Sequence, residues 1–273
     1  MKNKILITLL AVTSCIVLLS GCAKKEIKNS SAQSNNSEKI ELNISAAASL
    51  KEAMVDIQEK FKSIEPNTDL VVNYGSSGSL QQQIEQGAPC DIFISAGQSQ
   101  MKKLDEENLL LESTKKDLVK NELVLIGPKS TAITSINDLK TDKVKKIAAG
   151  EPSSVPAGKY ADETFNNLNI KSDIESKLVF AKDVKEVLAW SISGNADVGF
   201  VYLSDAFNNK DVKIIETIPE TCHSPITYPI SIVKNTSKSD VTKQVDAAKQ
   251  FEDFLFTDDA KNIFEKYGYK SID

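Results

Sequence analysis

The sequence contains no arginine, and all 33 of its basic residues are lysine. Sites for carboxylates commonly hold their ligand with the two parallel N–H donors of a guanidinium group, which lysine cannot imitate. An arginine clamp for an amino acid or another carboxylate is therefore excluded. The formal net charge of −5 at pH 7 also argues against a nucleic-acid partner, because such proteins carry a surplus of positive charge.

Histidine and cysteine are scarce as well. The single histidine, His223, has one cysteine beside it and no further partner at the spacing of a metal site. A hydrolytic enzyme needs a nucleophile with a base, or a metal cluster, and His223 has no evident partner for either. The sequence therefore predicts no enzyme, no directly coordinated metal and no cofactor, with a hydrolase of phosphate esters as a minor alternative.

The first 22 residues have the pattern of a secretory signal. Two lysines precede an almost wholly apolar run over residues 5–19, and the chain continues with Ser20-Gly21-Cys22. The run is too short for a typical membrane span and ends in small residues, as signal peptides do. Leu19 to Cys22 resembles the lipobox of bacterial lipoproteins, which implies a signal peptide over residues 1–21 and a lipid anchor on Cys22. An ordinary signal peptide is the alternative.

A polar stretch separates the signal from the rest of the chain. Residues 22–39 are mainly Lys, Ser, Asn and Gln, with Ile27 as the one large apolar residue. Such a stretch cannot build a core, so we expect a flexible, lipid-anchored tether. Removing residues 1–21 takes away two lysines and no acidic residue, which leaves a net charge of about −7. From Ile40 onward the chain is long enough for one large domain or two lobes.

Only Cys90 and Cys222 belong to the predicted folded part, because Cys15 leaves with the signal and Cys22 is lipidated. A disulfide is possible in a protein outside the membrane. We favour two separate, partly buried thiols, since a separation of 132 residues says nothing about proximity in space.

A turn of small residues, Ser45 to Leu50, joins a predicted strand to a predicted helix. Apolar residues alternate over 40–44, as in a half-buried strand, and recur three or four apart over 50–61, as in an amphipathic helix. The first N–H groups of a helix are unpaired and attract anions, and alanines let a ligand approach them closely. The alternative is a structural capping box, with Ser49 at the N-cap and Glu52 three residues later.

Two further turns repeat this pattern. Gly75-Ser76-Ser77-Gly78-Ser79 connects a predicted strand at 70–74 to a short helix at 80–86, and a small-residue turn over 150–158 leads into a helix at about 158–168. A flexible surface turn is the alternative for the first of these. In open α/β sheets, ligands bind beyond the carboxyl ends of strands, where such turns converge. The turns at 45–50 and 75–79 are rich in donors and have no charged side chain, which indicates a site for a small anion.

Strands and helices alternate along the remaining chain, and repeated βα units predict a doubly wound α/β architecture. Pro229 lies within an extended segment, residues 226–233, and predicts an edge strand or a segment that crosses between lobes. Other strands are predicted at 91–95, 123–126, 146–149, 178–180, 198–202 and 214–215, and other helices at 98–107, 181–193, 241–256 and 260–267.

Five motifs, in order and with matching spacing, resemble those of the molybdate-binding proteins of ABC importers. The resemblance runs from about Ile40 to Tyr269. Cys90 stands where the family often has alanine, and Glu151 where aspartate is more usual, and neither change disturbs a donor position. The motifs are Ala46-Ala47-Ala48-Ser49-Leu50, Gly75-Ser76-Ser77-Gly78, Gly87-Ala88-Pro89-Cys90-Asp91, Val155-Pro156-Ala157-Gly158 and Gly199-Phe200-Val201-Tyr202.

The resemblance implies an α/β periplasmic binding protein of type II-like form, with two lobes, each a sheet flanked by helices, joined by crossing strands near 123–126 and 228–232. Lobe 1 would comprise residues 40–124 and 229–273, and lobe 2 residues 125–228. The lobes would close over the ligand like a trap.

The resemblance also implies the ligand contacts. Ser49 and Ser77 would reach molybdate from the first lobe. Ala157 and Val184 would reach it from the second lobe through backbone N–H groups, and Tyr202 through its hydroxyl. The protein would be a lipid-anchored monomer on the outer face of the cytoplasmic membrane that delivers molybdate, and tungstate, to an ABC permease. A binding protein for another tetrahedral oxyanion, such as sulfate, is the alternative.

The lipobox-like sequence gives a test of localisation. Replacing Cys22 with alanine removes the thiol that would carry the lipid, so Cys22→Ala should release a soluble protein or leave an uncleaved precursor. Cell fractionation and labelling with a radioactive fatty acid measure both outcomes. A variant that fractionates and labels like the parent would contradict the anchor.

Overall fold

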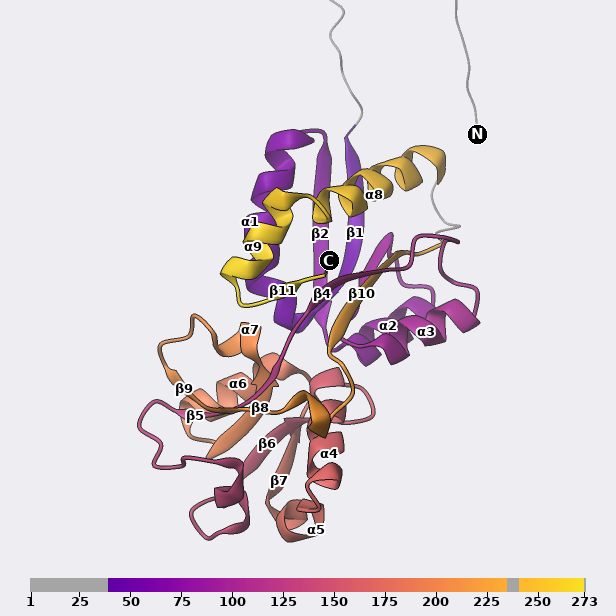
Figure 1. Cartoon of the computed structure of the whole chain (residues 1–273). Helices are drawn as coiled ribbons and strands as arrows, with labels where there is room; N and C mark the ends of the chain where they lie inside the picture. The colour runs from indigo at the N-terminus through magenta and orange to yellow at the C-terminus, as the bar shows by residue number, and fades with distance from the viewer. Residues whose placement is uncertain (1–38, 235–240, 273) are drawn as a thin grey trace, which may run out of the picture. The chain divides into compact units, whose positions relative to one another are not determined.

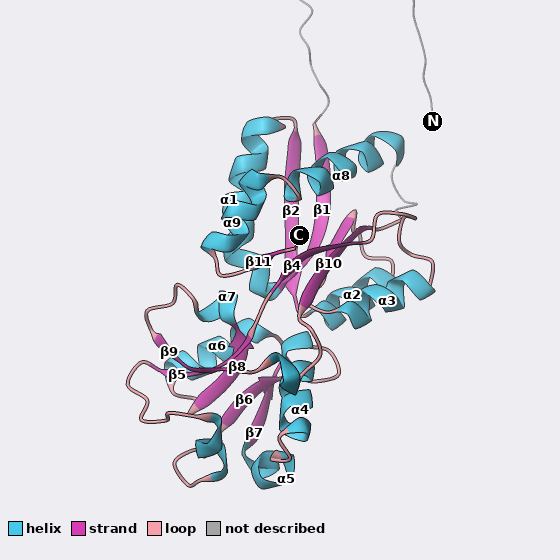
Figure 2. Cartoon of the chain, in the orientation of Figure 1, coloured by secondary structure: helices cyan, strands magenta, loops and turns pink. Residues whose placement is uncertain are grey.

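The computed structural model describes residues 39–234 and 241–272. It has a two-lobed α/β fold, with two mixed β-sheets flanked by helices (Figures 1 and 2). This is the fold class that the sequence predicted. The signal peptide, Cys22 and the tether up to residue 38 lie outside the described residues.

The first lobe is built on a six-stranded sheet in the order β11-β4-β10-β3-β1-β2. β1 pairs in parallel with β2 and β3, whereas β10 and β11 run antiparallel to their neighbours. The strands are β1 (Ile40–Ala47), β2 (Thr68–Gly75), β3 (Ile92–Ile94), β4 (Lys116–Lys120), β10 (Thr227–Ile232) and β11 (Lys270–Ser271), and the helices are α1 (Lys51–Ile64), α2 (Ser77–Glu85), α3 (Gln98–Glu106), α8 (Val241–Leu255) and α9 (Asp258–Lys266).

Helices cover both faces of this sheet because side chains alternate along a buried strand. On β3, Phe93 packs in a cluster with residues of α2 and α3, such as Leu80 and Met101. Its neighbours Ile92 and Ile94 belong instead to the cluster that contains Phe61 and other residues of α1, α8 and α9. The two helix groups are separate in Figure 1.

The second lobe is built on a five-stranded sheet in the order β7-β6-β8-β5-β9. β6 pairs in parallel with β7 and β8, and β5 runs antiparallel to β8 and β9. The strands are β5 (Leu123–Pro128), β6 (Ile147–Gly150), β7 (Leu178–Ala181), β8 (Val198–Tyr202) and β9 (Val212–Thr217). The α-helices are α4 (Pro156–Asn167), α5 (Lys171–Ile174), α6 (Val184–Ser193) and α7 (Leu203–Ala206). The 3₁₀ helices among the described residues, in both lobes, are η1 (Ala48–Leu50), η2 (Ile136–Lys140), η3 (Glu175–Lys177) and η4 (Glu220–Cys222).

The chain crosses from the first sheet to the second between β4 and β5 and returns between β9 and β10. The two crossings are bonded to each other, since the N–H of Asn121 donates to the carbonyl of Ile226 at 3.1 Å. Both lie a little earlier in the chain than the sequence suggested, because residues 123–126 and 228–232 are already inside a sheet. The exact limits proposed for the lobes stay a prediction.

Pro229 is not on an edge strand, so that part of the prediction was wrong. β10 lies between β4 and β3 and pairs with both. The register against β4 shifts between Tyr228 and Pro229, and a bulge accommodates a residue that has no N–H to donate. The carbonyl of Pro229 still accepts from the N–H of Ser95 at 3.0 Å.

Cys90 and Cys222 are separate, buried thiols, as favoured from the sequence.

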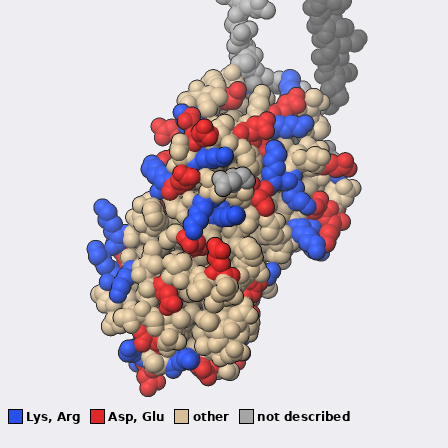
Figure 3. All heavy atoms as spheres, viewed as in Figure 1, with Lys and Arg blue, Asp and Glu red and all other residues tan. Residues whose placement is uncertain are grey.

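No helix within residues 39–234 and 241–272 is long and apolar enough to span a membrane. Lysines and acidic residues are intermixed on the face shown in Figure 3.

Candidate functional site

All five residues predicted to contact a ligand line one cavity between the lobes. Its volume is about 10 Å³, roughly the space of one water molecule, so the lobes are nearly in contact around it. Both lobes contribute to the lining, which consists of Ala47, Ala48, Ser49, Gly75, Ser76, Ser77, Ala96, Val155, Pro156, Ala157, Val184 and Tyr202.

Ser49 lies in the 3₁₀ turn η1, between β1 and α1, and is buried. It does not cap a helix, because the N-cap of η1 is Ala47 and that of α1 is Leu50, and neither makes a side-chain capping bond. The capping-box alternative with Glu52 was therefore wrong. The Oγ atom of Ser49 instead lies 2.9 Å from the hydroxyl of Tyr228.

Ser77 is the first residue of α2 and is 1% exposed. The cap of this helix is Ser76, whose Oγ accepts from the N–H of Ser79 at 3.3 Å. The Oγ of Ser77 accepts from the N–H of Ala96 at 2.9 Å. Since a hydroxyl donates one hydrogen and accepts through its lone pairs, the hydrogen of Ser77 is available to a ligand.

The second lobe presents the starts of two helices. Ala157 is the second residue of α4, which begins at Pro156 without a side-chain cap. Val184 is the first residue of α6, whose N-cap, Asp183, accepts from the N–H of Glu186 at 2.9 Å. First-turn N–H groups have no partner within the helix, so those of Ala157 and Val184 suit a ligand.

Tyr202 ends β8 and is 1% exposed. Its hydroxyl reaches across to the first lobe and donates to the carbonyl of Ala96 at 3.3 Å. Burial raises the pKa of Tyr202 well above its usual range, so the hydroxyl keeps its proton at neutral pH and remains a donor.

No residue that lines the cavity carries a charged side chain. Its polar groups are hydroxyls and N–H groups, and the starts of α2, α4 and α6 add the positive ends of helix dipoles. Such a site suits a small anion whose oxygens all act as acceptors. In the part of the chain that the structure describes, no cluster of His, Cys, Asp and Glu could hold a metal ion.

Ala96 was not predicted from the sequence, although its position just after the buried strand β3 could have suggested it, since carboxyl ends of parallel strands meet at one edge of a sheet. Its N–H bonds Ser77, and its carbonyl bonds Tyr202. Ala96 thus joins a residue of each lobe.

Direct contacts hold the lobes together around the cavity. The N–H of Gly78 donates to the carbonyl of Ser154 at 2.9 Å. At the rim, the ammonium of Lys185 on α6 lies 2.5 Å from Glu52 on α1 and 2.7 Å from Asp205 on α7. Burial disfavours the charge of Lys185, but the attraction of Asp205 and Glu52 outweighs it and raises the pKa of this lysine. Lys185 is therefore charged at neutral pH.

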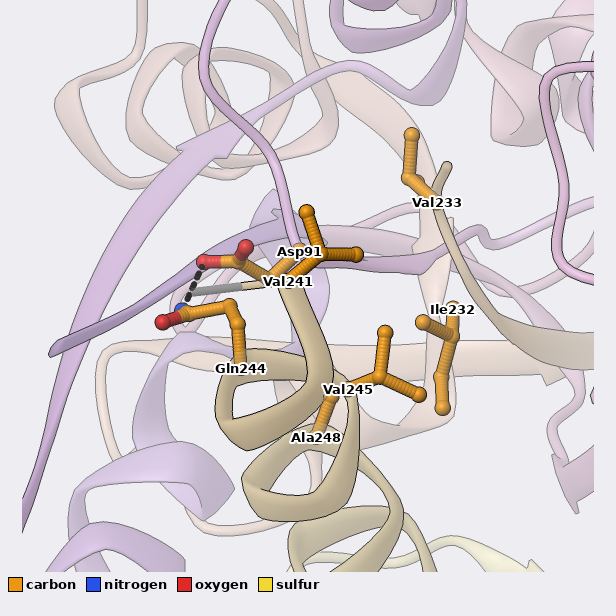
Figure 4. Close-up of a pocket in the computed structure, with 7 residues that line it drawn as sticks. All are labelled: Asp91, Ile232, Val233, Val241, Gln244, Val245 and Ala248. Carbon is orange, nitrogen blue, oxygen red and sulfur yellow. Dashed lines mark hydrogen bonds between the residues drawn. The ribbon is translucent and has the colours of Figure 1, made fainter. Parts of the chain in front are cut away.

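Figure 4 shows a second cavity, where α8 packs on the first sheet. Its volume is also about 10 Å³. The side-chain amide of Gln244 donates to Asp91 at 2.9 Å and to the carbonyl of Glu41 at 2.7 Å, and Asp91 accepts from the N–H of Asn43 at 2.7 Å. These bonds hold α8 against the sheet, and we assign the cavity no ligand.

Comparisons with known proteins identify the family of the chain. The family model described as bacterial extracellular solute-binding protein matches residues 42–270. A Bacillus subtilis protein assigned as an ABC transporter substrate-binding lipoprotein is 38% identical over 262 residues, 95% of this chain and 96% of that protein. The molybdate-binding protein of Haemophilus influenzae is 35% identical over 231 residues, 83% of this chain and 88% of that protein.

Among solved structures, a substrate-binding domain assigned to a molybdenum ABC transporter of Clostridium difficile is 62% identical, with a TM-score of 0.67. The match covers 86% of this chain and 100% of that chain.

Proposed function

The chain belongs to the bacterial extracellular solute-binding proteins, and on that basis we propose that it captures molybdate outside the cytoplasm and delivers it to an ABC permease. The observation that carries the proposal is the cavity between the lobes, which offers neutral donors and no charged side chain. Relatives named as molybdate-binding proteins support the choice of ligand. The family and these relatives are transport proteins, which favours a binding protein over a hydrolase.

Molybdate fits the chemistry of the lining. Near neutral pH it is a fully deprotonated tetrahedral dianion, so each of its oxygens accepts hydrogen bonds. The hydroxyls of Ser49 and Ser77, together with the N–H groups of Ala157 and Val184, would supply donors. The Tyr202 hydroxyl would also donate, once its hydrogen leaves the carbonyl of Ala96 for the ligand. The helix starts would offset the negative charge without a buried countercharge.

Capture requires the lobes to move. A tetrahedral oxyanion needs more space than the cavity of about 10 Å³ offers, so we expect the lobes to separate to admit it and then to close around it. Because both lobes donate to the ligand, bound molybdate would bridge them and shift the population toward the closed form.

We further propose that tungstate, which has the same charge and shape, is a second ligand. The protein would act as a monomer held to the outer face of the cytoplasmic membrane by a lipid on Cys22. The Bacillus relative that is named a lipoprotein supports this placement.

The donor side chains can be tested one at a time. Ser49→Ala, Ser77→Ala and Tyr202→Phe should each weaken molybdate binding by about ten- to a hundredfold, because a hydrogen bond to a charged partner is worth roughly 1.5–3 kcal/mol. Titration calorimetry measures the effect. Ser153→Ala is the matched control, since Ser153 is exposed and its Oγ donates to Glu151. Unaltered affinity in all three variants would remove these side chains from the site.

Selectivity follows from the lack of acceptors. Phosphate usually keeps a proton near neutral pH, and its O–H would be buried without a partner, at a cost on the order of 1–3 kcal/mol or more. Sulfate has no proton but is smaller, so its hydrogen bonds would be long. In a competition titration, tungstate should displace molybdate, sulfate should do so weakly and phosphate should not. Displacement by phosphate at comparable concentration would contradict this account.

Closure can be blocked at Gly78. A Cβ atom there would lie 2.5 Å from the carbonyl oxygen of Ser154 on the opposite lobe, although alanine suits the helix itself. Gly78→Ala should therefore fold normally but weaken molybdate binding by about tenfold, since overpacking costs about 1–3 kcal/mol. The control is Gln82→Ala, at an exposed position of the same helix. Small-angle scattering with saturating molybdate should give a larger radius of gyration for Gly78→Ala than for the control, and equal radii and affinities would contradict the mechanism.

A further inference from the structure

Two residues outside the cavity determine how the Ser49 hydroxyl is used. Tyr228, on β10, is fully buried, and its hydroxyl oxygen lies 2.9 Å from the Oγ of Ser49. Asn121, in the crossing between β4 and β5, places its Nδ2 atom 3.2 Å from the same tyrosine oxygen. Neither residue lines the cavity, so both act on the site through Ser49.

The side chain of Asn121 can face Tyr228 only with its nitrogen. Its Oδ1 atom accepts from the backbone N–H groups of Glu122 at 2.9 Å and of Ser204 at 3.4 Å. Nδ2 also donates to the Oγ of Ser204 at 2.9 Å. An amide nitrogen donates and does not accept. The hydroxyl oxygen of Tyr228 is therefore the acceptor in its contact with Asn121.

The direction of the next bond follows. Tyr228 has one hydrogen, and burial raises the pKa of its hydroxyl well above the usual range, so the hydrogen is retained. The Tyr202 hydroxyl, whose own hydrogen is on the carbonyl of Ala96, and the Ser49 hydroxyl both lie near this hydrogen. We take Ser49 as the acceptor, because its Oγ lies at the hydrogen-bonding distance of 2.9 Å from Tyr228 and the tyrosine oxygen is engaged by Asn121. The single hydrogen of Ser49 can then point into the cavity that it lines.

We propose that Asn121 and Tyr228 are positioning residues for ligand selectivity: they hold Ser49 as a donor toward the cavity and so disfavour anions that carry a proton, such as hydrogen phosphate. This inference rests on the proposed function. A serine hydroxyl that is free to rotate can turn its hydrogen away and accept from a protonated ligand. A serine that accepts from Tyr228 has only one further lone pair, so fewer of its orientations can accept from a protonated ligand.

Tyr228→Phe tests the proposal, because it removes the hydroxyl and keeps the ring. The ring contacts Tyr202 and Tyr269 edge to face, with centroids 5.6 and 5.5 Å apart. We expect molybdate to bind about three- to tenfold more weakly and hydrogen phosphate to bind more tightly. The ratio of the phosphate to the molybdate dissociation constant should fall at least about tenfold, as expected for one hydrogen bond. Calorimetry in mildly alkaline buffer compares the two as dianions.

A control ligand and a control variant test whether the proton of hydrogen phosphate causes the change in selectivity. Sulfate is a dianion without a proton, so its dissociation constant relative to that of molybdate should stay the same in Tyr228→Phe. Tyr160→Phe also removes the hydroxyl of a buried tyrosine, but this residue is in α4, where its ring packs against His223. The phosphate-to-molybdate ratio should stay at the wild-type value in Tyr160→Phe.

Asn121→Asp provides an independent second variant. It places an acceptor where Nδ2 donates, so Tyr228 would turn its hydrogen toward residue 121 and accept from Ser49 instead. The Ser49 hydrogen would leave the cavity, and the phosphate-to-molybdate ratio should fall further than in Tyr228→Phe. Thermal unfolding of each variant identifies those that are folded, and Asn121→Asp decides the question if Tyr228→Phe does not fold.

The outcomes separate the two proposals. A wild-type protein that does not bind molybdate overturns the proposed function. If the wild type binds molybdate, and folded Tyr228→Phe and Asn121→Asp keep the wild-type ratio as Tyr160→Phe does, the positioning role is overturned. A fall in the ratio for sulfate equal to that for phosphate also overturns it, because the effect would then concern size and not the proton.

Discussion

The arrangement of this protein depends on holding an anion without a buried countercharge. A lining of hydroxyls, backbone N–H groups and small apolar residues cannot neutralise charge, so helix starts must supply the positive potential. Parallel strands bring the starts of the following helices to one edge of a sheet. The turns after β1 and β2 share an edge of the first sheet, and those after β6 and β7 share an edge of the second. Small residues in these turns let the two lobes approach closely, as the contact between Gly78 and Ser154 shows.

Charged residues take part in closure, but at the rim. Lys185 bridges Glu52 of the opposite lobe and Asp205 of its own. The Glu52 side chain is 52% exposed, and exposed ion pairs contribute little, about 0–1 kcal/mol. Asp205 also accepts from the N–H of Tyr202 at 3.3 Å, so it keeps Lys185 beside the site whether or not Glu52 is reached. Because the ion pair between Lys185 and Glu52 is weak, the ligand and not this ion pair determines the population of the closed form.

Local patterns in the sequence predicted the donor turns and the alternation of strands and helices, because each depends on neighbouring residues. They failed where distant residues decide. Ser49 looked like a helix cap, but its side-chain partner, Tyr228, is 179 residues away. Pro229 looked like an edge residue because a bulge cannot be seen in one strand alone. The strand β4, Lys116–Lys120, was missed because three of its five residues are charged, and only its pairing with β10 and β11 makes it a strand.

The position of Asn121 and Tyr228 suggests why the fold can direct Ser49 before a ligand arrives. Asn121 lies in one crossing between the lobes, and Tyr228 in the strand that follows the other, and the crossings are bonded through Asn121 and Ile226. When two lobes rotate about their connections, residues at the connections move least. The bonds from Asn121 through Tyr228 to Ser49 can therefore persist in open and closed forms. A donor oriented in advance loses less freedom on binding, so the same segments that permit closure also prepare one of the groups on which closure depends.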